Sequence, residues 1–280
     1  MTRLMIFGQG FTASAYRATR SATAGEVDAT RRRADGEANL GFDGLSASPA
    51  LRKALAAADH LLVSIPPQGD TDLVLAHFSR ELAARPRNIV YLSTIGVYGN
   101  HDGEWIDESA ELRPSNARTR ARVRAEQGWL DLAQHGAAVS ILRLSGIYGP
   151  GRSALEAIRA GTARRIIKPG QVFNRIHVED IARAIAAAFA TPSGLGIVNV
   201  TDHEPAPPQD VVAFAADLLG VAPPPELAFA EANLSEMARS FYGENKRVSN
   251  RKLREKFGVT LRFPTYREGL RSLAAALSKD

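Results

Sequence analysis

Short apolar runs rich in β-branched residues recur along this chain, with helix-forming stretches between them. Strands that alternate with helices in this way form a parallel sheet that is buried on both faces. The expected strands are residues 4–7, 26–30, 60–65, 88–93, 138–144 and 196–200. The expected helices are residues 13–21, 48–58, 72–84, 116–135, 154–161 and 178–191. The sequence therefore predicts an α/β fold with a doubly wound parallel sheet of the Rossmann type.

The regular alternation weakens in the second half of the chain. Prolines cluster at residues 205–208 and 223–225, and proline interrupts regular elements because it lacks the amide hydrogen. A helix is expected between the two clusters, at residues 209–219, and an amphipathic helix closes the chain at residues 266–278. These late segments predict a smaller lobe that packs over the carboxyl edge of the sheet.

The chain length fits one large α/β domain or two small ones, because it has 280 residues and domains have roughly 150. We expect residues 1–165 to form a dinucleotide-binding domain, with the strand at residues 196–200 returning to its sheet. Residues 166–280 should mainly form a small substrate-binding lobe and the C-terminal helix.

The composition excludes several classes of protein. Hydrophobic residues make up 45% of the chain and charged residues 23%, which is a globular balance rather than that of a disordered chain. The chain has no cysteine, so a disulfide framework, a thiolate nucleophile and a cysteine-ligated metal are excluded. The six histidines have no metal-binding spacing, and a Gly-x-Ser-x-Gly elbow is absent. We therefore expect neither a metal site nor a hydrolase triad.

The charges do not favour binding to nucleic acid or membrane. The chain has 35 Lys and Arg against 30 Asp and Glu, a net charge of +5. The basic residues are spread from Arg3 to Lys279 with acidic residues between them, whereas nucleic-acid binders gather them on one face. The start of the chain has no basic leader before a long apolar run, and no apolar run approaches roughly 20 residues. We expect a cytoplasmic protein.

The turn after the first strand has the Gly-x-Gly-x-x-Gly/Ala pattern of dinucleotide-binding proteins, Gly8-Gln9-Gly10-Phe11-Thr12-Ala13. Gly8 permits a tight turn, and Gly10 lets the backbone approach a pyrophosphate. Ala13 lets the helix pack closely on the strand, while the free N–H groups of the helix face the anion. A simple strand-to-helix turn is the alternative. We assign Gly8, Gly10, Phe11 and Thr12 to cofactor binding.

The end of the second strand indicates which dinucleotide binds. A carboxylate there would contact the ribose 2′-hydroxyl of NAD, whereas arginine would accommodate the 2′-phosphate of NADP. Arg31 follows this strand and is itself followed by Arg32 and Arg33, while the competing Asp28 lies within the strand. We therefore predict NADP(H) over NAD(H), bound by Arg31 and Arg32, with a solvated basic loop as the alternative.

Four segments resemble the extended short-chain dehydrogenases/reductases, the NAD-dependent epimerase/dehydratase group. The resemblance covers residues from Gly8 to about Gly220. It is carried by residues 92–99 (LSTIGVYG), 142–151 (LRLSGIYGPG), 175–182 (RIHVEDIA) and 199–202 (NVTD). Residues 245–250 (NKRVSN) are similar to the C-terminal stretch of an atypical branch of that family.

The resemblance implies a catalytic Ser or Thr together with a Tyr-x-x-x-Lys pair. In the family, Tyr exchanges a proton with the substrate oxygen, Lys holds the nicotinamide ribose, and Ser or Thr steadies the substrate oxygen. Thr94 matches the last role. With Ala125-Glu126 as the register, the Tyr and Lys positions are occupied by Arg118 and Arg122.

The two arginines change the expected chemistry. The pKa of arginine lies above about 12, so Arg118 cannot act as the acid. Our catalytic candidates are Thr94, Tyr98 and Arg118. Arg122 would donate hydrogen bonds to ribose hydroxyls from the same helical face as Arg118. An exposed basic helix face, continued by Arg120 and Arg124, is the alternative.

Tyr98 follows a strand end, where ligands of doubly wound sheets gather, and is a candidate proton donor. Its alternative is a packing role with a hydrogen-bonded hydroxyl. Glu108 is a candidate partner of Arg118 or of the substrate, and an ordinary surface acid is the alternative. The remaining cofactor candidates are Ser64, Ile65, Pro66, Ser93 and Arg122.

The resemblance implies that His177 lies at the wall of the substrate pocket. Tyr148 follows the end of a strand adjacent to that of Tyr98, so its phenol could also approach a substrate. We assign Tyr148, Arg152, Arg175 and His177 to substrate binding. His177 could be an acid, a base or a ligand because imidazole changes charge near neutral pH. A structural histidine that bonds the backbone is the alternative.

Two functions therefore compete. The first is an NADP(H)-dependent oxidoreductase or epimerase/dehydratase-like enzyme acting on a carbonyl, hydroxyl or nucleotide-sugar-like small molecule. The second is an NADP(H)-binding sensor that has lost the chemistry, as the missing Tyr and Lys suggest. The sequence leaves the oligomeric state open, although relatives of this kind often pair as homodimers through the region of residues 116–135.

Overall fold

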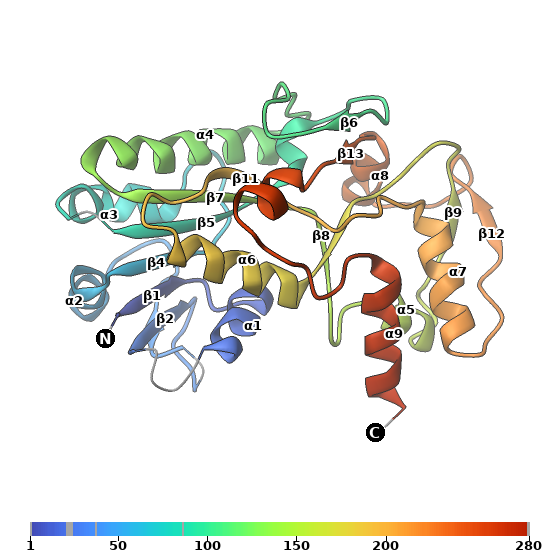
Figure 1. Ribbon diagram of the computed structural model, residues 1–280, viewed down its shortest axis with the longest axis horizontal. Helices are drawn as coiled ribbons and strands as arrows, with labels where there is room; N and C mark the ends of the chain where they lie inside the picture. The colour runs from blue at the N-terminus through green and yellow to red at the C-terminus, as the bar shows by residue number, and fades with distance from the viewer. Residues whose placement is uncertain (1, 21–24, 37, 86, 279–280) are drawn as a thin grey trace.

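The predicted parallel sheet is confirmed by the computed structural model, which describes residues 2–20, 25–36, 38–85 and 87–278. Seven strands form the central sheet in the order β11-β7-β5-β4-β1-β2-β3, and neighbouring strands are parallel (Figure 1). The strands are β1 (Leu4–Phe7), β2 (Val27–Arg31), β3 (Leu40–Gly41), β4 (His60–Val63), β5 (Asn88–Thr94), β7 (Ala138–Leu144) and β11 (Gly196–Val200). Six of them match the expected ranges within two residues, whereas β3 was not expected.

Helices cover both faces of this sheet, which makes it doubly wound. One face packs against α1 (Phe11–Thr19) and α6 (Val178–Ala190). The other packs against α2 (Pro49–Ala57), α3 (Leu73–Ala83) and α4 (Ala117–Asp131). Successive side chains of a strand point to opposite faces, so the apolar run of β1 contributes to both cores.

The later segments form a lobe beyond the carboxyl ends of the strands, at the right of Figure 1. A separate apolar cluster holds α5 (Ala154–Arg159), α7 (Pro208–Leu218) and α9 (Tyr266–Leu277) together. Three parallel strand pairs complete the lobe and its junction with the sheet: β8 (Gly146–Tyr148) with β10 (Arg175–His177), β9 (Arg165–Ile167) with β12 (Glu226–Ala228), and β6 (Trp105–Ile106) with β13 (Arg247–Val248).

Three short helices occur at junctions of the chain. They are η1 (Ile95–Tyr98) after β5, η2 (Leu132–His135) after α4, and η3 (Lys252–Lys256), a single π-helical turn that follows β13. The helix α8 (Glu236–Tyr242) precedes β13. Because β11 pairs with β7, the chain returns to the sheet as expected, while the division of the chain near residue 165 stays a prediction.

The outer edge of β11 is bonded to side chains from elsewhere in the chain. The backbone N–H of Asn199 donates to Glu108 Oε1 at 2.8 Å. Lys252 Nζ donates to the backbone oxygen of Ile197 at 2.6 Å. These two side chains come from the segment after β6 and from η3, so the junction region covers the edge of the sheet.

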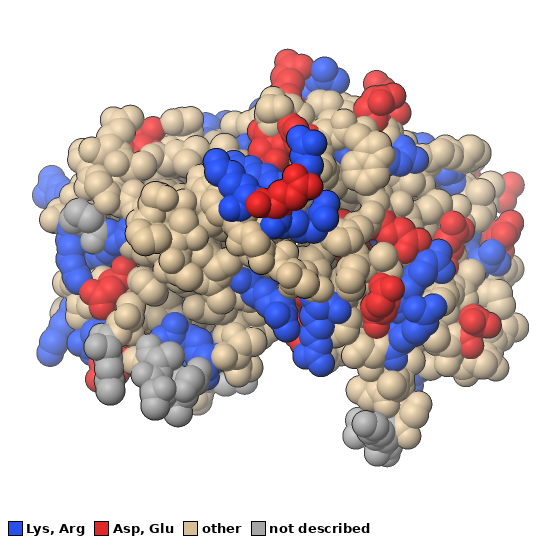
Figure 2. Space-filling view, in the orientation of Figure 1, with Lys and Arg blue, Asp and Glu red and all other residues tan. Residues whose placement is uncertain are grey.

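The surface charges are interspersed on the face drawn in Figure 2, where Lys and Arg lie among Asp and Glu. Within the described residues, no helix has both the length and the apolar character needed to cross a membrane.

Candidate cofactor and substrate site

The glycine-rich turn is held by the end of β2. The backbone N–H of Gly8 donates to Thr30 Oγ1 at 3.0 Å, and the N–H of Gln9 donates to the Thr30 carbonyl at 2.8 Å. Arg31 Nε then donates to the carbonyl of Gln9 at 2.9 Å. The second strand therefore fixes the peptide plane of the turn on which a diphosphate would rest.

The glycines of this turn meet two different constraints. Gly8 has φ +93°, and a β-carbon there would lie 2.9 Å from Ile65 Cγ1, so the position favours glycine. A β-carbon at Gly10 would meet no described heavy atom within 4 Å. Gly10 is the N-cap of α1 and no side chain caps this helix, so the helix N-terminus suits an anion. Ala13 is fully buried, as the close packing of helix on strand requires.

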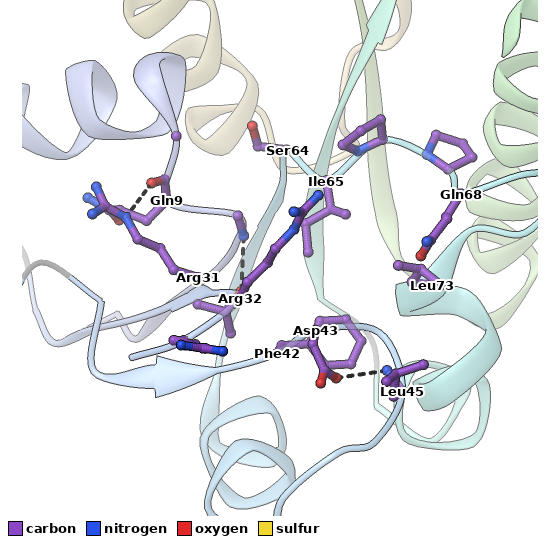
Figure 3. Close-up of a pocket in the computed structure, with 16 residues that line it drawn as sticks. Gln9, Arg31, Arg32, Phe42, Asp43, Leu45, Ser64, Ile65, Gln68 and Leu73 are labelled. Atoms are coloured by element: carbon purple, nitrogen blue, oxygen red, sulfur yellow. Dashed lines mark hydrogen bonds between the residues drawn. The ribbon is translucent and has the colours of Figure 1, made fainter. Parts of the chain in front are cut away.

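A cavity of about 1050 Å³ opens in front of this turn (Figure 3). Its walls come from the turn, the end of β2, the segment after β3 and the segment after β4. The lining residues are Gly8, Gln9, Gly10, Thr30, Arg31, Arg32, Arg33, Phe42, Asp43, Leu45, Ser64, Ile65, Pro66, Pro67, Gln68 and Leu73. Aromatic and apolar residues and three arginines therefore line the same cavity.

The three arginines differ in their contacts. Arg31 forms an ion pair with Asp35 at 2.5 Å in addition to its bond with Gln9, and Figure 3 shows it beside Gln9. Arg32 and Arg33 are exposed and line the cavity. Asp28, the competing residue for an NAD-type contact, accepts from Asn39 Nδ2 at 2.7 Å. It does not belong to the described lining of the cavity.

Thr94 ends β5 and is partly buried. Its Oγ1 accepts the backbone N–H of Gly96 at 3.1 Å, which begins η1. A hydroxyl can accept and donate at the same time, so the O–H of Thr94 remains available to a substrate oxygen.

The two arginines in the Tyr and Lys register have separate partners. Arg122 Nη1 donates to the Leu92 carbonyl at 2.7 Å and to the Tyr91 hydroxyl at 3.0 Å. Arg118 lies on the exposed surface, with its guanidinium carbon 5.4 Å from the ring centre of Phe241 on α8. Arg122 therefore fastens α4 to β5, whereas Arg118 links α4 with the C-terminal lobe.

The position of Tyr98 agrees with the packing alternative. The side chain is fully buried, and its hydroxyl donates to Asn199 Oδ1 at 2.8 Å. Burial raises the pKa of Tyr98. Its ring also lies 4.8 Å from the guanidinium carbon of Arg143. Glu108 binds the backbone of β11 as described above, so it pairs with a strand edge rather than with Arg118.

A buried ion pair holds α4 against the sheet next to Thr94. Arg143 Nη2 of β7 lies 2.6 Å from Glu126 Oε2 of α4, and both side chains are buried. Ser93 Oγ donates to Glu126 Oε1 at 2.5 Å. Ser93, a cofactor candidate, therefore uses its hydroxyl to position α4.

The predicted substrate residues form two groups. Arg152 lies with its guanidinium carbon 5.7 Å from the ring centre of Phe11, so a substrate candidate meets a cofactor candidate at the start of α1. Tyr148 and His177 are buried, and their ring centres are 5.1 Å apart. Arg175 donates to the carbonyls of Phe173 and Ala206 at 2.9 and 3.1 Å.

His177 also has a structural contact, as its alternative requires. Its Nδ1 accepts the backbone N–H of Glu179 at 3.3 Å and caps the N-terminus of α6. Burial lowers the pKa of His177 to about 4, so the imidazole is neutral at physiological pH. A neutral ring with Nδ1 as acceptor carries its proton on Nε2.

Thr12 is buried at the first turn of α1 and is not among the described residues that line the cavity. Among the described residues, no group of three or more His, Asp and Glu is arranged to hold a metal ion.

Comparison with known proteins decides the family. The model of the NAD dependent epimerase/dehydratase family matches residues 69–201. The fold also matches the solved structure of a functionally unknown conserved protein from Silicibacter pomeroyi DSS, with a TM-score of 0.87 and 44% identity over 99% of both chains. Residues 69–201 therefore carry a domain of the NAD-dependent epimerase/dehydratase family. The family is described as NAD dependent.

Two curated relatives of the chain match over shorter stretches. Protein YeeZ of Escherichia coli (strain K12) is 32% identical over 181 residues, which cover 61% of this chain and 63% of YeeZ. The 3-diazoavenalumate denitrifying reductase of Streptomyces sp is 30% identical over 140 residues, which cover 46% of this chain and 45% of the reductase. The chain therefore matches less than two thirds of the length of either relative.

Several residues that line the cavity lie outside the motifs recognisable in the sequence. Phe42, Asp43 and Leu45 follow the short strand β3, and Leu73 begins α3. Only their place directly after a strand could have indicated these residues, because the segments that follow parallel strands meet at the same edge of the sheet. Ser64, Ile65 and Pro66 follow β4, a strand that the sequence predicts, so their place in the cavity could be expected. The residues after β3 could not be assigned in this way because the sequence does not predict β3.

Proposed function

We propose that the chain is an NADP(H)-dependent oxidoreductase or epimerase/dehydratase-like enzyme that acts on a carbonyl, hydroxyl or nucleotide-sugar-like small molecule. One observation carries the proposal. Gly10 at the N-terminus of α1, Arg31 and Arg32 all border one cavity of about 1050 Å³, and no side chain caps this helix. These groups suit the two charged parts of NADP(H), its diphosphate and its 2′-phosphate.

Arg31 and Arg32 would contact the 2′-phosphate from two different sides. Arg31 is oriented by the carbonyl of Gln9 and by Asp35, so it would contact the 2′-phosphate from a fixed direction. Arg32 has an exposed guanidinium that lines the cavity, and it would close on the phosphate from the second side. Guanidinium groups donate paired hydrogen bonds to phosphate oxygens.

The nicotinamide ring of the bound coenzyme would supply or accept the hydride. On the side of the protein, the Thr94 hydroxyl would donate a hydrogen bond to the substrate oxygen and hold it in position. Arg118 would add a positive charge to that side of the site without exchanging a proton, because a guanidinium stays protonated. Most of the rate enhancement would then come from holding the nicotinamide ring and the substrate at near-attack distance.

The name of one relative supports a redox function. The Streptomyces protein that is 30% identical over part of its length is described as a reductase. We also propose that the protein binds a small-molecule substrate, forms a homodimer and is cytoplasmic.

The test is a calorimetric comparison of NADP(H) with NAD(H). We expect the double variant Arg31→Ala/Arg32→Ala to lose about tenfold or more in affinity for NADP(H), since charged hydrogen bonds are each worth about 1.5–3 kcal/mol. Affinity for NAD(H) should change much less. Arg120→Ala, which removes an exposed charge from α4, is the matched control. Equal affinities of the unmodified protein for both coenzymes would refute the NADP(H) preference.

A sensor that binds NADP(H) without turnover is the second candidate. The contacts of the two register arginines favour it, because Arg122 is bonded to Leu92 and Tyr91 while Arg118 lies on Phe241. Such a protein should distinguish oxidised from reduced coenzyme, since only a difference in affinity can shift a state. Oxidation of NADPH with any member of a carbonyl or nucleotide-sugar panel favours the enzyme. Tight binding without turnover across that panel favours the sensor.

A further inference from the structure

A second cavity, of about 380 Å³, lies at the β6–β13 junction. It is lined by Trp105, Ile106, Asp107, Ser109, Ala110, Ser249 and Arg251. In the described part of the chain it shares no lining residue with the cofactor cavity. Figure 1 places β6 and β13 at the top of the molecule, on the side away from β1 and β2. The two cavities are therefore separate sites.

The backbone of this cavity is well fixed. β6 and β13 pair in parallel, with Trp105 opposite Arg247 and Ile106 opposite Val248. The N–H of Ser249 continues the pairing and donates to the Ile106 carbonyl at 2.8 Å. Ile106 and Val248 are buried in a small apolar cluster. The paired backbone of β6 and β13 therefore holds the exposed side chains of the cavity in place.

Trp105 is the apolar wall of the cavity. Its side chain is 59% exposed, whereas the other tryptophan, Trp129, is fully buried. A single exposed apolar side chain is common on protein surfaces. Trp105 differs because it borders a cavity that also holds an acid, a base and two hydroxyl groups.

Asp107 provides a hydrogen-bond acceptor. Its Oδ1 accepts the N–H of Ser109 at 2.9 Å and the hydroxyl of Ser109 at 2.5 Å. These bonds, with a smaller contribution from the charge of Arg251, lower the pKa of Asp107. The carboxylate is thus ionised and oriented. Its second oxygen, Oδ2, has no hydrogen-bond partner among the described residues.

Arg251 provides the donors. Its backbone N–H is bonded to Ser249 Oγ at 3.2 Å, which fixes the start of the side chain. The guanidinium is exposed, and its Nε lies 4.0 Å from Glu255 Oε2, at the limit of an ion pair. Because Asp107 and Arg251 carry opposite charges, the cavity complements a neutral ligand that both donates and accepts hydrogen bonds.

From this combination we infer that the cavity binds one pyranose ring of an uncharged saccharide. A pyranose has an apolar C–H face, which would stack on the indole of Trp105, and a rim of hydroxyl groups. One hydroxyl would donate to Asp107 Oδ2, and another would accept from Arg251. The volume lies near the lower limit of about 300–1,000 Å³ for ligand pockets, which suits one ring better than a larger ligand. This binding goes beyond the proposed function, since it requires neither the coenzyme nor Thr94.

The test uses the full chain and the fluorescence of Trp105, which is accessible to quenchers while Trp129 is not. The probes are the methyl glycosides of glucose, galactose, mannose and N-acetylglucosamine. We expect at least one of them to shift the emission saturably and to protect the exposed indole from acrylamide. Uridine and adenosine are the competing neutral rings.

Two variants separate binding from folding. Asp107→Asn should raise the dissociation constant of the glycoside about tenfold or more, because a charged hydrogen bond becomes a neutral one. Glu104→Gln removes an exposed acid of the same loop outside the cavity lining and should leave it unchanged. Both variants should bind NADP(H) as the unmodified protein does, which tests the two sites independently.

Three results would overturn the inference. The first is the lack of a saturable response to every glycoside at tens of millimolar. The second is protection of Trp105 by a nucleoside but by no glycoside, which would assign the cavity to a base. The third is an equal loss of affinity in Asp107→Asn and Glu104→Gln.

Discussion

Asp202 is expected to make the stability of the protein fall as the pH rises. The side chain is 1% exposed, and burial raises its pKa from 3.8 to about 8. Its Oδ1 accepts the backbone N–H of Glu204 at 3.1 Å, while Oδ2 has no partner within the described residues. The folded protein therefore keeps this carboxyl protonated over a range in which the unfolded chain releases the proton.

The sign and size of the effect follow from linkage. A group that binds more protons in the folded state stabilises it at low pH, and this stability is lost as the pH rises towards the folded pKa. For Asp202 the loss begins above the unfolded pKa and ends near pH 8. Within that window the slope is about 1.4 kcal/mol per pH unit.

The perturbation is Asp202→Asn, because asparagine cannot titrate and still offers an oxygen to the N–H of Glu204. The assay is urea unfolding of both proteins between pH 5 and 9. The free energy of unfolding of the unmodified protein should fall relative to the variant by about 1.4 kcal/mol per pH unit, and the difference should level off above pH 8. His177, with its pKa lowered to about 4, stabilises both proteins equally as the pH rises towards 6.5, so it cancels in the difference.

Asp70→Asn is the control, since Asp70 is an exposed acid paired with Arg124. Its stability curve should run parallel to that of the unmodified protein. If the Asp202→Asn curve is also parallel, the carboxyl is ionised in the folded state and the reasoning fails.

Three further substitutions test the packing around the proposed site. Gly269→Ala places a β-carbon 2.1 Å from the Tyr148 hydroxyl oxygen and should cost about 1–3 kcal/mol of unfolding free energy in urea, with partial recovery when Tyr148→Phe removes that oxygen. Glu126→Gln leaves Arg143 buried without its ionic partner and should cost about 3–5 kcal/mol in the same assay; an effect below about 1 kcal/mol would indicate a solvated pair. Gly8→Ala forces a side chain into a φ of +93° and should weaken NADP(H) binding in calorimetry by about tenfold or more, as strain of about 1–3 kcal/mol implies, whereas an unchanged affinity would place the diphosphate elsewhere.

Much of the central sheet could be predicted because its strands are buried on both faces. β5 and β7 are runs of apolar residues long enough for their composition alone to indicate a strand. The two-residue strands β3 and β6 are too short to show any periodicity. Each is defined by its pairing with a distant segment, which no local pattern contains.

The candidate site was predicted unevenly for a related reason. The glycine turn is a local motif, so Gly8 and Gly10 could be assigned from adjacent residues. The contacts of Arg122 with Leu92 span 30 positions along the chain, and those of Tyr98 with Asn199 span 101. Whether a polar side chain faces a ligand or bonds to the core depends on such distant partners.

The bonds of Glu108 and Lys252 to β11 restrict how two copies of the chain could associate. A strand from a neighbouring molecule can extend a sheet only through backbone groups that are still unbonded. Here the Asn199 amide and the Ile197 carbonyl are already bonded to side chains. A homodimer formed at this side of the molecule would therefore have to associate through side chains, and its two sheets would stay separate rather than merge into one.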